Sequence, residues 1–193
     1  MNLEPIRLET PLRLDDIEPL KSGDVVRIYG VLYAARDAAH FRMTEAVDKG
    51  EPLPFDPEGQ VVYYTGPAPA RPGSALGPAG PTTASRMDPY APSLIERGLR
   101  GMIGKGARSR PLLEAMRRHG CVYFGAIEGT AALLADRVKE AEVVAHEDLG
   151  PEAILRLVVE EFPVVVINDL HGGDLYREGR KRWRKTTGSG ESG

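Results

Sequence analysis

Short apolar runs separated by turn residues make up the N-terminal third of the chain. β-Branched and aromatic residues predict a strand over residues 25–33 and another over residues 60–66, and residues 35–43 are expected to begin a short helix. Residues 1–23 are expected to form an extended arm and a short lead-in, and residues 50–59 a turn. The pattern therefore predicts that the first half of the protein is mostly strand.

From residue 88 onward, helical and strand-like patterns alternate. Apolar spacing and terminal residues predict helices over residues 88–99, 109–120, 129–138 and 150–162. Short apolar runs predict strands over residues 100–106, 121–127, 140–148 and 163–169. In the last helix, Ile154, Leu157 and Val158 would share one face. The alternation predicts an α/β domain with two sheet regions and helices packed on one side.

The stretch from residue 66 to residue 83 contains five prolines and four glycines. One interpretation is a flexible or polyproline linker between two domains. The other is a functional loop inside one domain, which is favoured because the segments on both sides are expected to be structured.

Composition narrows the class of protein. The 193 residues fit one domain over residues 1–193, with an N-terminal arm over residues 1–20 and a basic, then glycine- and serine-rich tail over residues 178–193. With 41% hydrophobic residues and a net charge of −3, neither nucleic acid nor a membrane is expected as a partner. No apolar run reaches about 18 residues, so no transmembrane helix is expected.

The cysteine count limits the chemistry. Cys121 is the only cysteine, so no internal disulfide can form and a cytoplasmic location is expected. One thiol cannot hold an iron–sulfur cluster or a cysteine-type zinc site. Because it begins an apolar run, Cys121 is expected in the core.

Polar side chains cluster where predicted strands give way to loops. The three clusters are Arg36, Asp37 and His40; Thr82, Thr83 and Arg86; and Lys105, Arg108 and Ser109. Arginine suits a carboxylate because its planar fork bonds both oxygens, and lysine adds a point charge. These clusters suggest a pocket for a small anion, while the alternative for each is an ordinary surface turn or helix cap.

Other motifs are not favoured. "GMIGKG" departs from a P-loop, since Gly106 follows Lys105 where serine or threonine is needed. The four histidines have no metal-ligand spacing, and His171 in "NDLHGGD" is expected in a turn.

Five segments carry a resemblance to a known family. They occur in this order along the chain: "ARDAAH", "GPTTASRMD", "GKGARS", "GCVYFGAIEGTAALLA" and "EEFPVVVINDLHGGDLY". From about residue 10 to residue 177 the chain resembles the β subunit of iron–sulfur hydro-lyases of the class I fumarase and L-tartrate dehydratase type. That subunit is equivalent to the C-terminal domain of the single-chain enzymes.

The resemblance implies a fold, a cofactor and partners. The fold would be a three-layer swivelling β/β/α domain. A 4Fe-4S cluster would be held by three cysteines of a separate α subunit, leaving one iron open to bind substrate. The partners would be that α subunit and a small dicarboxylate, in a higher oligomer with two copies of each subunit.

The resemblance also implies roles for individual residues. Thr82 would transfer the proton at the carbon beside a carboxylate; Arg36, Arg86 and Lys105 would bind substrate carboxylates; Thr83 and Asp37 would support them. A threonine hydroxyl is a poor base, so it needs the field of neighbouring cations. The chain departs from the family at Cys121, Glu128 and Ser85, none of which belongs to this charged set.

Three functions stay open at this point. Hydration of fumarate to (S)-malate is the first, and dehydration of tartrate uses the same charged set. A non-catalytic binding or assembly domain of the same fold is the third. It predicts loss of the charged residues, and all of them are present.

Overall fold

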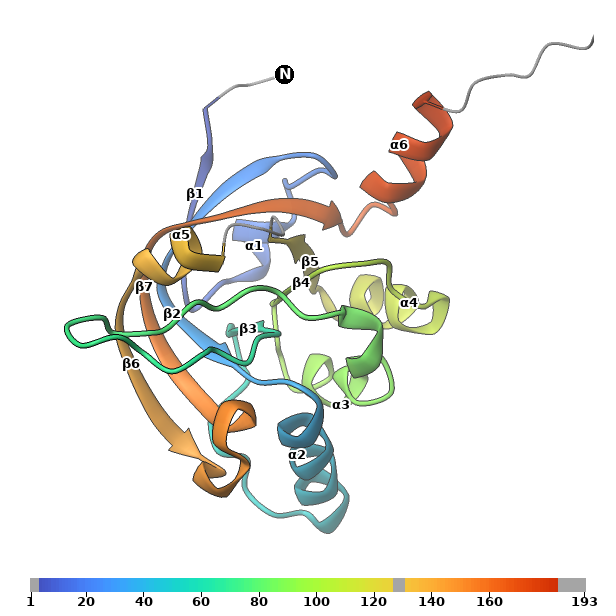
Figure 1. Ribbon diagram of the computed structural model, residues 1–193. Helices are drawn as coiled ribbons and strands as arrows, with labels where there is room; N and C mark the ends of the chain where they lie inside the picture. The colour runs from blue at the N-terminus through green and yellow to red at the C-terminus, as the bar shows by residue number, and fades with distance from the viewer. Residues whose placement is uncertain (1–3, 127–130, 184–193) are drawn as a thin grey trace, which may run out of the picture.

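The computed structural model describes residues 4–126 and 131–183 (Figure 1). Within them the strands form one mixed sheet in the order β1-β2-β3-β4-β5-β7-β6. The strands are β1 (Ile6–Glu9), β2 (Val25–Ala34), β3 (Val61–Tyr63), β4 (Gly101–Gly104), β5 (Val122–Gly125), β6 (Val138–Ala145) and β7 (Ile154–Asn168). Because β7 also pairs with β2, strands β2, β3, β4, β5 and β7 close into a small barrel. The α/β prediction is confirmed, and the two expected sheet regions are one continuous sheet.

Helices connect the parallel strands. Neighbouring strands from β1 to β5 pair in parallel, whereas β7 is antiparallel to β2, β5 and β6. Parallel neighbours need a crossover, and from β2 to β5 the crossovers contain α2 (Asp37–Lys49), the 3-10 helix η1 (Ala84–Met87), α3 (Ala91–Ile95) and α4 (Arg110–His119). In Figure 1, α2, α3 and α4 lie together on one side of the barrel, as the sequence predicted.

Side-chain alternation along the strands produces two cores. One set of strand residues packs in the cluster that fills the barrel: Val61, Tyr63, Ile103, Val122 and Phe124. The alternate set packs in a second cluster with side chains of α2, α3 and α4: Val62, Tyr64, Met102 and Tyr123. Strands covered on both faces have no polar side to show, which explains their continuous apolar runs.

The remaining helices lie at the ends of the barrel strands. They are α1 (Leu14–Ile17), α5 (Ala131–Asp136), the 3-10 helix η2 (Glu147–Glu152) and α6 (Leu175–Trp183). Ile17 of α1 is fully buried and joins the barrel core with Leu8 and Leu12. Of the helices in the described ranges, none combines the length and the apolar character needed to cross a bilayer.

The predicted helix over residues 150–162 is wrong. After η2, the chain forms the first half of β7, the longest strand of the sheet. The register with β2 shifts between Ile28 and Gly30, where Glu161 adopts a positive φ of 53°. Such a β-bulge places an extra residue in one strand. The bulge leaves Val159 and Phe162, which both pack in the barrel core, three positions apart. The predicted helix face has a different cause: Ile154 and Leu157 pack in the two different cores, on opposite faces of a strand that is covered on both sides.

Other predicted elements agree with the structure apart from their bounds. The strand predicted over residues 25–33 is β2, and the helix predicted over residues 109–120 is α4, ended by Gly120 in a left-handed conformation. The helix expected to begin near residue 35 extends to Lys49. The N-terminal arm contains β1, which pairs with β2, and part of the basic tail belongs to α6.

The proline- and glycine-rich stretch does not link two domains. It leaves the sheet after β3 and returns beside the same strand, since the Thr65 hydroxyl donates to the Gly80 carbonyl at 2.8 Å and the Thr82 N–H donates to the Tyr64 carbonyl at 2.7 Å. The next strand along the chain, β4, is the parallel neighbour of β3. The stretch is therefore a loop between two neighbouring strands of one sheet.

The bulge in β7 makes a prediction about two neighbouring exposed residues, Glu160 and Glu161. Glycine at position 160 should lower the free energy of unfolding by about 0.5–1 kcal/mol, since that residue of β7 does not have a positive φ. Glycine at position 161 should give a protein about 1–2 kcal/mol more stable than the Glu160→Gly variant, because the left-handed backbone strains a side chain. Urea unfolding of both variants measures the difference. Equal losses would contradict the bulge.

Candidate active site

Two loops run side by side at the ends of β3 and β4. The Lys105 N–H donates to the Thr82 carbonyl at 3.1 Å, and the Ala84 N–H donates to the Lys105 carbonyl at 2.8 Å. Thr83 and Lys105 form an isolated parallel bridge. The close approach requires glycine at position 104, where an added Cβ would lie 3.0 Å from both the Ala84 Cβ and the Tyr64 ring. The carboxyl ends of two parallel strands therefore present Thr82, Thr83 and Lys105 together.

Four of the six predicted site residues are linked by direct side-chain contacts. Arg86 Nη2 donates to Thr82 Oγ1 at 2.6 Å and to Asp37 Oδ2 at 3.0 Å. The same Asp37 oxygen lies 3.5 Å from Arg36 Nε. Asp37 is the first residue of α2 and Arg36 is its N-cap, so the helix start places both beside the threonine loop. The result is a cluster in which one carboxylate is shared by two guanidinium groups.

Glu152 is a member of this cluster that the sequence did not indicate. Its Oε1 accepts a hydrogen bond from Arg36 Nη2 at 2.7 Å, and its Oε2 accepts one from the Ala38 N–H at 2.9 Å. Glu152 is the last residue of η2, in the segment predicted as a helix, and lies more than a hundred positions after Arg36 in the sequence. No local pattern could have placed it beside Arg36. It orients that guanidinium and the start of α2.

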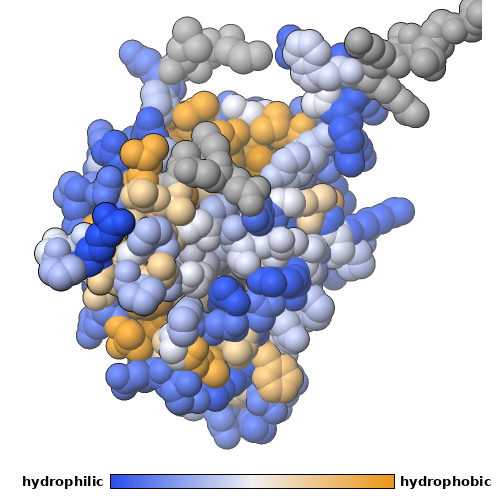
Figure 2. All heavy atoms as spheres, viewed as in Figure 1, coloured by the Kyte–Doolittle hydropathy of each residue, from blue (hydrophilic) through white to orange (hydrophobic). Residues whose placement is uncertain are grey.

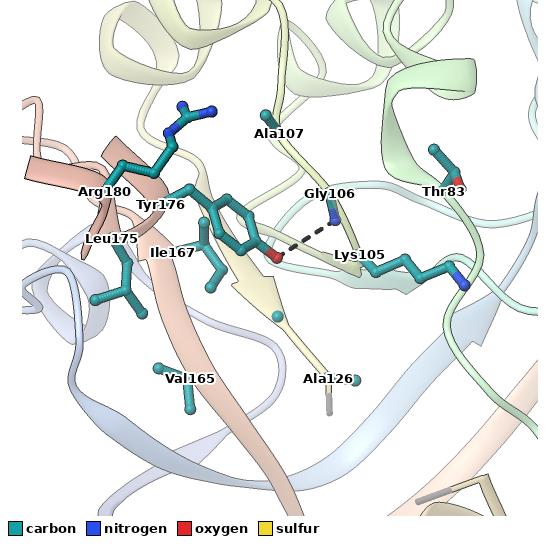
Figure 3. Close-up of a pocket in the computed structure, with 11 residues that line it drawn as sticks. Thr83, Lys105, Gly106, Ala107, Ala126, Val165, Ile167, Leu175, Tyr176 and Arg180 are labelled. Carbon is teal, nitrogen blue, oxygen red and sulfur yellow. Dashed lines mark hydrogen bonds between the residues drawn. The ribbon is translucent and has the colours of Figure 1, made fainter. Parts of the chain in front are cut away.

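Lys105 and Thr83 line an open cleft of about 720 Å³ next to this cluster (Figure 3). In Figure 3 the Lys105 side chain extends toward the loop that carries Thr83. The other wall of the cleft is apolar, with Val165 and Ile167 of β7 and Leu175 of α6. The cleft therefore has the positively charged Lys105 on one side and apolar side chains on the other.

The turn after Lys105 is held by two tyrosine hydroxyls. The Gly106 N–H donates to the Tyr176 hydroxyl at 3.3 Å, and the Tyr123 hydroxyl donates to the Gly106 carbonyl at 3.0 Å. Tyr123 belongs to β5 and Tyr176 to α6. The position of Lys105 is therefore coupled both to the sheet and to the C-terminal helix.

A buried ion pair lies behind both loops. Arg108 Nε donates to Asp88 Oδ1 at 2.7 Å, and the Ser109 N–H donates to Asp88 Oδ2 at 2.6 Å. The Arg108 side chain is fully buried, and its guanidinium lies 5.3 Å from the ring centre of Tyr64 and 4.9 Å from that of Tyr123. Arg108 and Ser109, which the sequence suggested as part of an anion pocket, are therefore behind the candidate site and support its loops.

His40 is buried behind Arg36. Its Nδ1 lies 3.2 Å from the Arg36 carbonyl oxygen, and its ring meets the Tyr64 ring edge-on at 5.3 Å between centres. Burial lowers the pKa of His40 to about 4, and the charge of Arg108 acts in the same direction. The imidazole is therefore neutral at physiological pH and has a supporting role.

The single cysteine is not suited to bind a metal. Cys121 is fully buried, as predicted, in the second core cluster, which packs against α2, α3 and α4. Burial raises the pKa of its thiol to about 12. Metal ligation needs the thiolate. In the part of the chain that the structure describes, no group of three or more histidine, cysteine, aspartate or glutamate side chains could hold a metal ion. His171 lies in a turn, where its N–H donates to Asp169 Oδ1 at 2.8 Å, as expected.

A family model described as the C-terminus of fumarase matches residues 2–179. The chain belongs to this family. The membership confirms the resemblance carried by the "GPTTASRMD" and "GKGARS" segments, which form the two adjacent loops of the candidate active site. Glu128, one of the departures from the family pattern, lies outside the described residues.

The relatives of this fumarase C-terminus chain are of two kinds. Fumarate hydratase 2 of Leishmania major is 41% identical over 80% of this chain and 28% of its own length. The aerobic class I fumarate hydratase of Escherichia coli is 40% identical over 77% of this chain and 28% of its own length. A chain of Methanocaldococcus jannaschii, whose name describes an L(+)-tartrate dehydratase subunit beta, is 36% identical over 86% of this chain and 89% of its own length. This chain spans less than a third of these two fumarate hydratases and most of the tartrate dehydratase relative.

The buried ion pair predicts a large loss of stability on Asp88→Asn. The substitution leaves the buried Arg108 guanidinium without its counter-charge, which should lower the free energy of unfolding by about 3–5 kcal/mol. Asp37→Asn is the matched control, since its ion pair with Arg86 is partly exposed and should contribute less than about 1 kcal/mol. Urea unfolding at neutral pH tests both. Similar losses for the two variants would show that the Asp88 pair is not buried.

His40 predicts a specific loss of stability in mild acid. The unfolded chain binds a proton at this residue below pH 6.5, whereas the folded chain does so only below about pH 4. Stability from His40 is therefore complete above pH 6.5 and falls by about 3 kcal/mol as the pH decreases toward 4. His40→Gln should remove this part of the pH dependence, measured by urea unfolding from pH 7 to pH 4. An unchanged slope in the variant would contradict the buried neutral imidazole.

Proposed function

We propose that this chain is the β subunit of an iron–sulfur-dependent hydro-lyase that reversibly adds water to a small dicarboxylate, with fumarate and (S)-malate as the substrate pair. Family membership supports a lyase of this class. The observation that carries the proposal is the hydrogen bond of 2.6 Å from Arg86 Nη2 to Thr82 Oγ1. It places the positive charge of the Arg86 guanidinium beside the hydroxyl of the proposed proton-transferring residue.

The contact addresses the weakness of threonine as a base. A donor bound to Oγ1 stabilises negative charge on that oxygen as its proton leaves, so Arg86 favours the deprotonated form. In dehydration, the deprotonated Thr82 oxygen takes the proton from the carbon beside a carboxylate. The electron pair of that C–H bond forms the double bond, and the hydroxyl group of the neighbouring carbon leaves as hydroxide, which together with the proton makes water. In hydration, the Thr82 hydroxyl returns a proton to the same carbon while hydroxide adds to the neighbouring carbon. The adjacent Lys105 strengthens the field in which this transfer takes place.

The charged residues around Thr82 bind the substrate carboxylates in this proposal. Arg36 and Arg86 offer planar forks, and Lys105 offers a point charge from the other loop. Asp37 holds both guanidinium groups in the absence of substrate, since its Oδ2 lies 3.0 Å from Arg86 Nη2 and 3.5 Å from Arg36 Nε. Thr83, which faces the cleft beside Lys105, supports the bound dicarboxylate.

The iron–sulfur cluster does not fit the described residues of this chain. The only cysteine is buried with a raised pKa, and the described residues contain no other cluster of ligands for a metal ion. We therefore assign the 4Fe-4S cluster to a separate α subunit. The chain spans less than a third of two fumarate hydratases, and one relative is named as a subunit beta, which supports a partner that supplies the rest of the enzyme.

Two finer parts of the proposal follow from the family. The barrel with its helices on one side would act as a swivelling β/β/α domain, and the complete enzyme would contain two copies of each subunit. Tartrate is the second candidate substrate. It is favoured by one observation, namely that the tartrate dehydratase relative matches this chain over 89% of its own length.

Replacing Thr82 by valine tests the proposed role directly. Valine keeps the shape and the β-branched backbone preference, so folding and assembly should survive. Turnover of the complex with the α subunit should fall by about two orders of magnitude or more, the usual contribution of a positioned acid or base. Exchange of the substrate C–H proton with deuterated solvent should slow in parallel, while the substrate KM changes much less.

Thr83→Val is the matched control for this experiment. Thr83 is exposed, and valine there leaves the Arg86 contact with Thr82 in place, so turnover should fall less than in Thr82→Val. If Thr83→Val loses turnover and exchange while Thr82→Val keeps both, the proton-transferring residue is Thr83 and the assignment to Thr82 is wrong. If both variants remain active, the base lies elsewhere and the proposed role of this loop is wrong.

A further inference from the structure

Among the described residues, the C-terminal helix α6 is hydrogen-bonded to the rest of the protein through Tyr176 and Glu178, in its first half. The Ser22 hydroxyl donates to the Glu178 carboxylate at 3.0 Å, and the Tyr176 hydroxyl accepts the Gly106 N–H. No described residue of α6 is buried, and its last four residues, 180–183, are all exposed. In Figure 1 this end of the helix projects away from the barrel. An isolated helix of this length is marginal in water, so packing against another surface would stabilise it.

The projecting end carries an unusual set of side chains. Its basic residues are Arg177, Arg180, Lys181 and Arg182, against the single acidic residue Glu178, whereas the whole chain has a net charge of −3. Trp183, the only tryptophan of the chain, is 80% exposed. Tryptophan and arginine are the residues that contribute most to protein interfaces. In Figure 2 this region is mostly hydrophilic, with hydrophobic atoms on the body of the protein beside it.

The helix lies on the same face as the candidate active site. Tyr176 contacts the turn that follows Lys105, and Arg180 lines the cleft that also contains Lys105 and Thr83 (Figure 3). If the α subunit completes the site, it must approach this face. A partner that reaches Lys105 then meets α6 at the edge of the same cleft.

We propose that the exposed half of α6 is a docking surface for the α subunit. This inference rests on the proposed function, because the occupant is the subunit that completes the site. The charge of the helix requires an acidic surface on that partner, with an apolar recess for the Trp183 ring. The contact between Tyr176 and Gly106 connects this surface to the Lys105 turn.

The experiment uses the sole tryptophan as a probe. The chain is labelled with fluorotryptophan, so that Trp183 gives one fluorine NMR signal, and is titrated with the purified α subunit while hydratase activity is measured in the same samples. The signal should shift and broaden in step with complex formation. An active complex in which the signal does not move would overturn the docking surface and leave the proposed function intact. Absence of both complex and activity would overturn both.

A charge-reversed variant provides the second measurement. Arg180→Glu, Lys181→Glu and Arg182→Glu together should weaken the complex by about tenfold or more at low salt and flatten the salt dependence of binding. The matched control reverses three exposed basic residues outside α6: Lys49, Arg97 and Lys139. It carries the same change in net charge and should alter the affinity by less than about twofold. Equal weakening by both variants would overturn the proposal, since it would reflect net charge alone.

Other anionic occupants are tested with the same labelled chain. Phosphatidylcholine vesicles containing phosphatidylserine, and a short DNA duplex, are added separately at physiological salt. The proposal expects no shift of the Trp183 signal with either probe. A shift with vesicles or DNA, together with none from the α subunit, would overturn it.

Discussion

The geometry of the candidate active site depends on one buried ion pair. Asp88 follows the loop that carries Thr82 and Arg86, and Arg108 follows the turn that carries Lys105, so their contact at 2.7 Å joins the two loops from behind. Burying two charges is costly unless both are paired and hydrogen-bonded. The second Asp88 oxygen accepts the Ser109 N–H, and two aromatic rings flank the guanidinium. A pair of this kind contributes more to the precision of the site than to the stability of the fold.

The barrel explains why this pair can be buried. Strands β3 and β4 are parallel neighbours, so both loops leave the same edge of the sheet, and α2, α3 and α4 cover the outer face on which Arg108 lies. A separate set of contacts lies among the more exposed side chains, from Arg86 to Thr82 and Asp37 and from Asp37 to Arg36. In the proposed function, the guanidinium groups that Asp37 holds in place would bind a small dicarboxylate with little rearrangement.

Local signals in the sequence predicted much of this arrangement. Strand β2, helix α4 and the loop before Thr82 follow from β-branched runs, capping residues and the density of proline and glycine. The first half of β7 could not be predicted, because Ile154 and Leu157 pack in different cores on the two faces of the strand and together have the spacing of a helix face. The roles of Glu152 and Asp88 depend on partners distant in sequence, Arg36 and Arg108, and no local pattern reports such a contact. The sequence motifs indicated the residues of the candidate site. The residues that support them, Glu152 and Asp88, were identified only from the fold.

The central claim is that this chain supplies one half of a hydro-lyase site, and mixing the two halves tests it most directly. The α subunit, loaded with its cluster, is titrated with this chain, and the hydration of fumarate and the dehydration of tartrate are followed. The account predicts no turnover from either subunit alone and a rise that saturates at an equimolar ratio for one of the two substrates. A stable complex that turns over none of fumarate, malate or tartrate would contradict it.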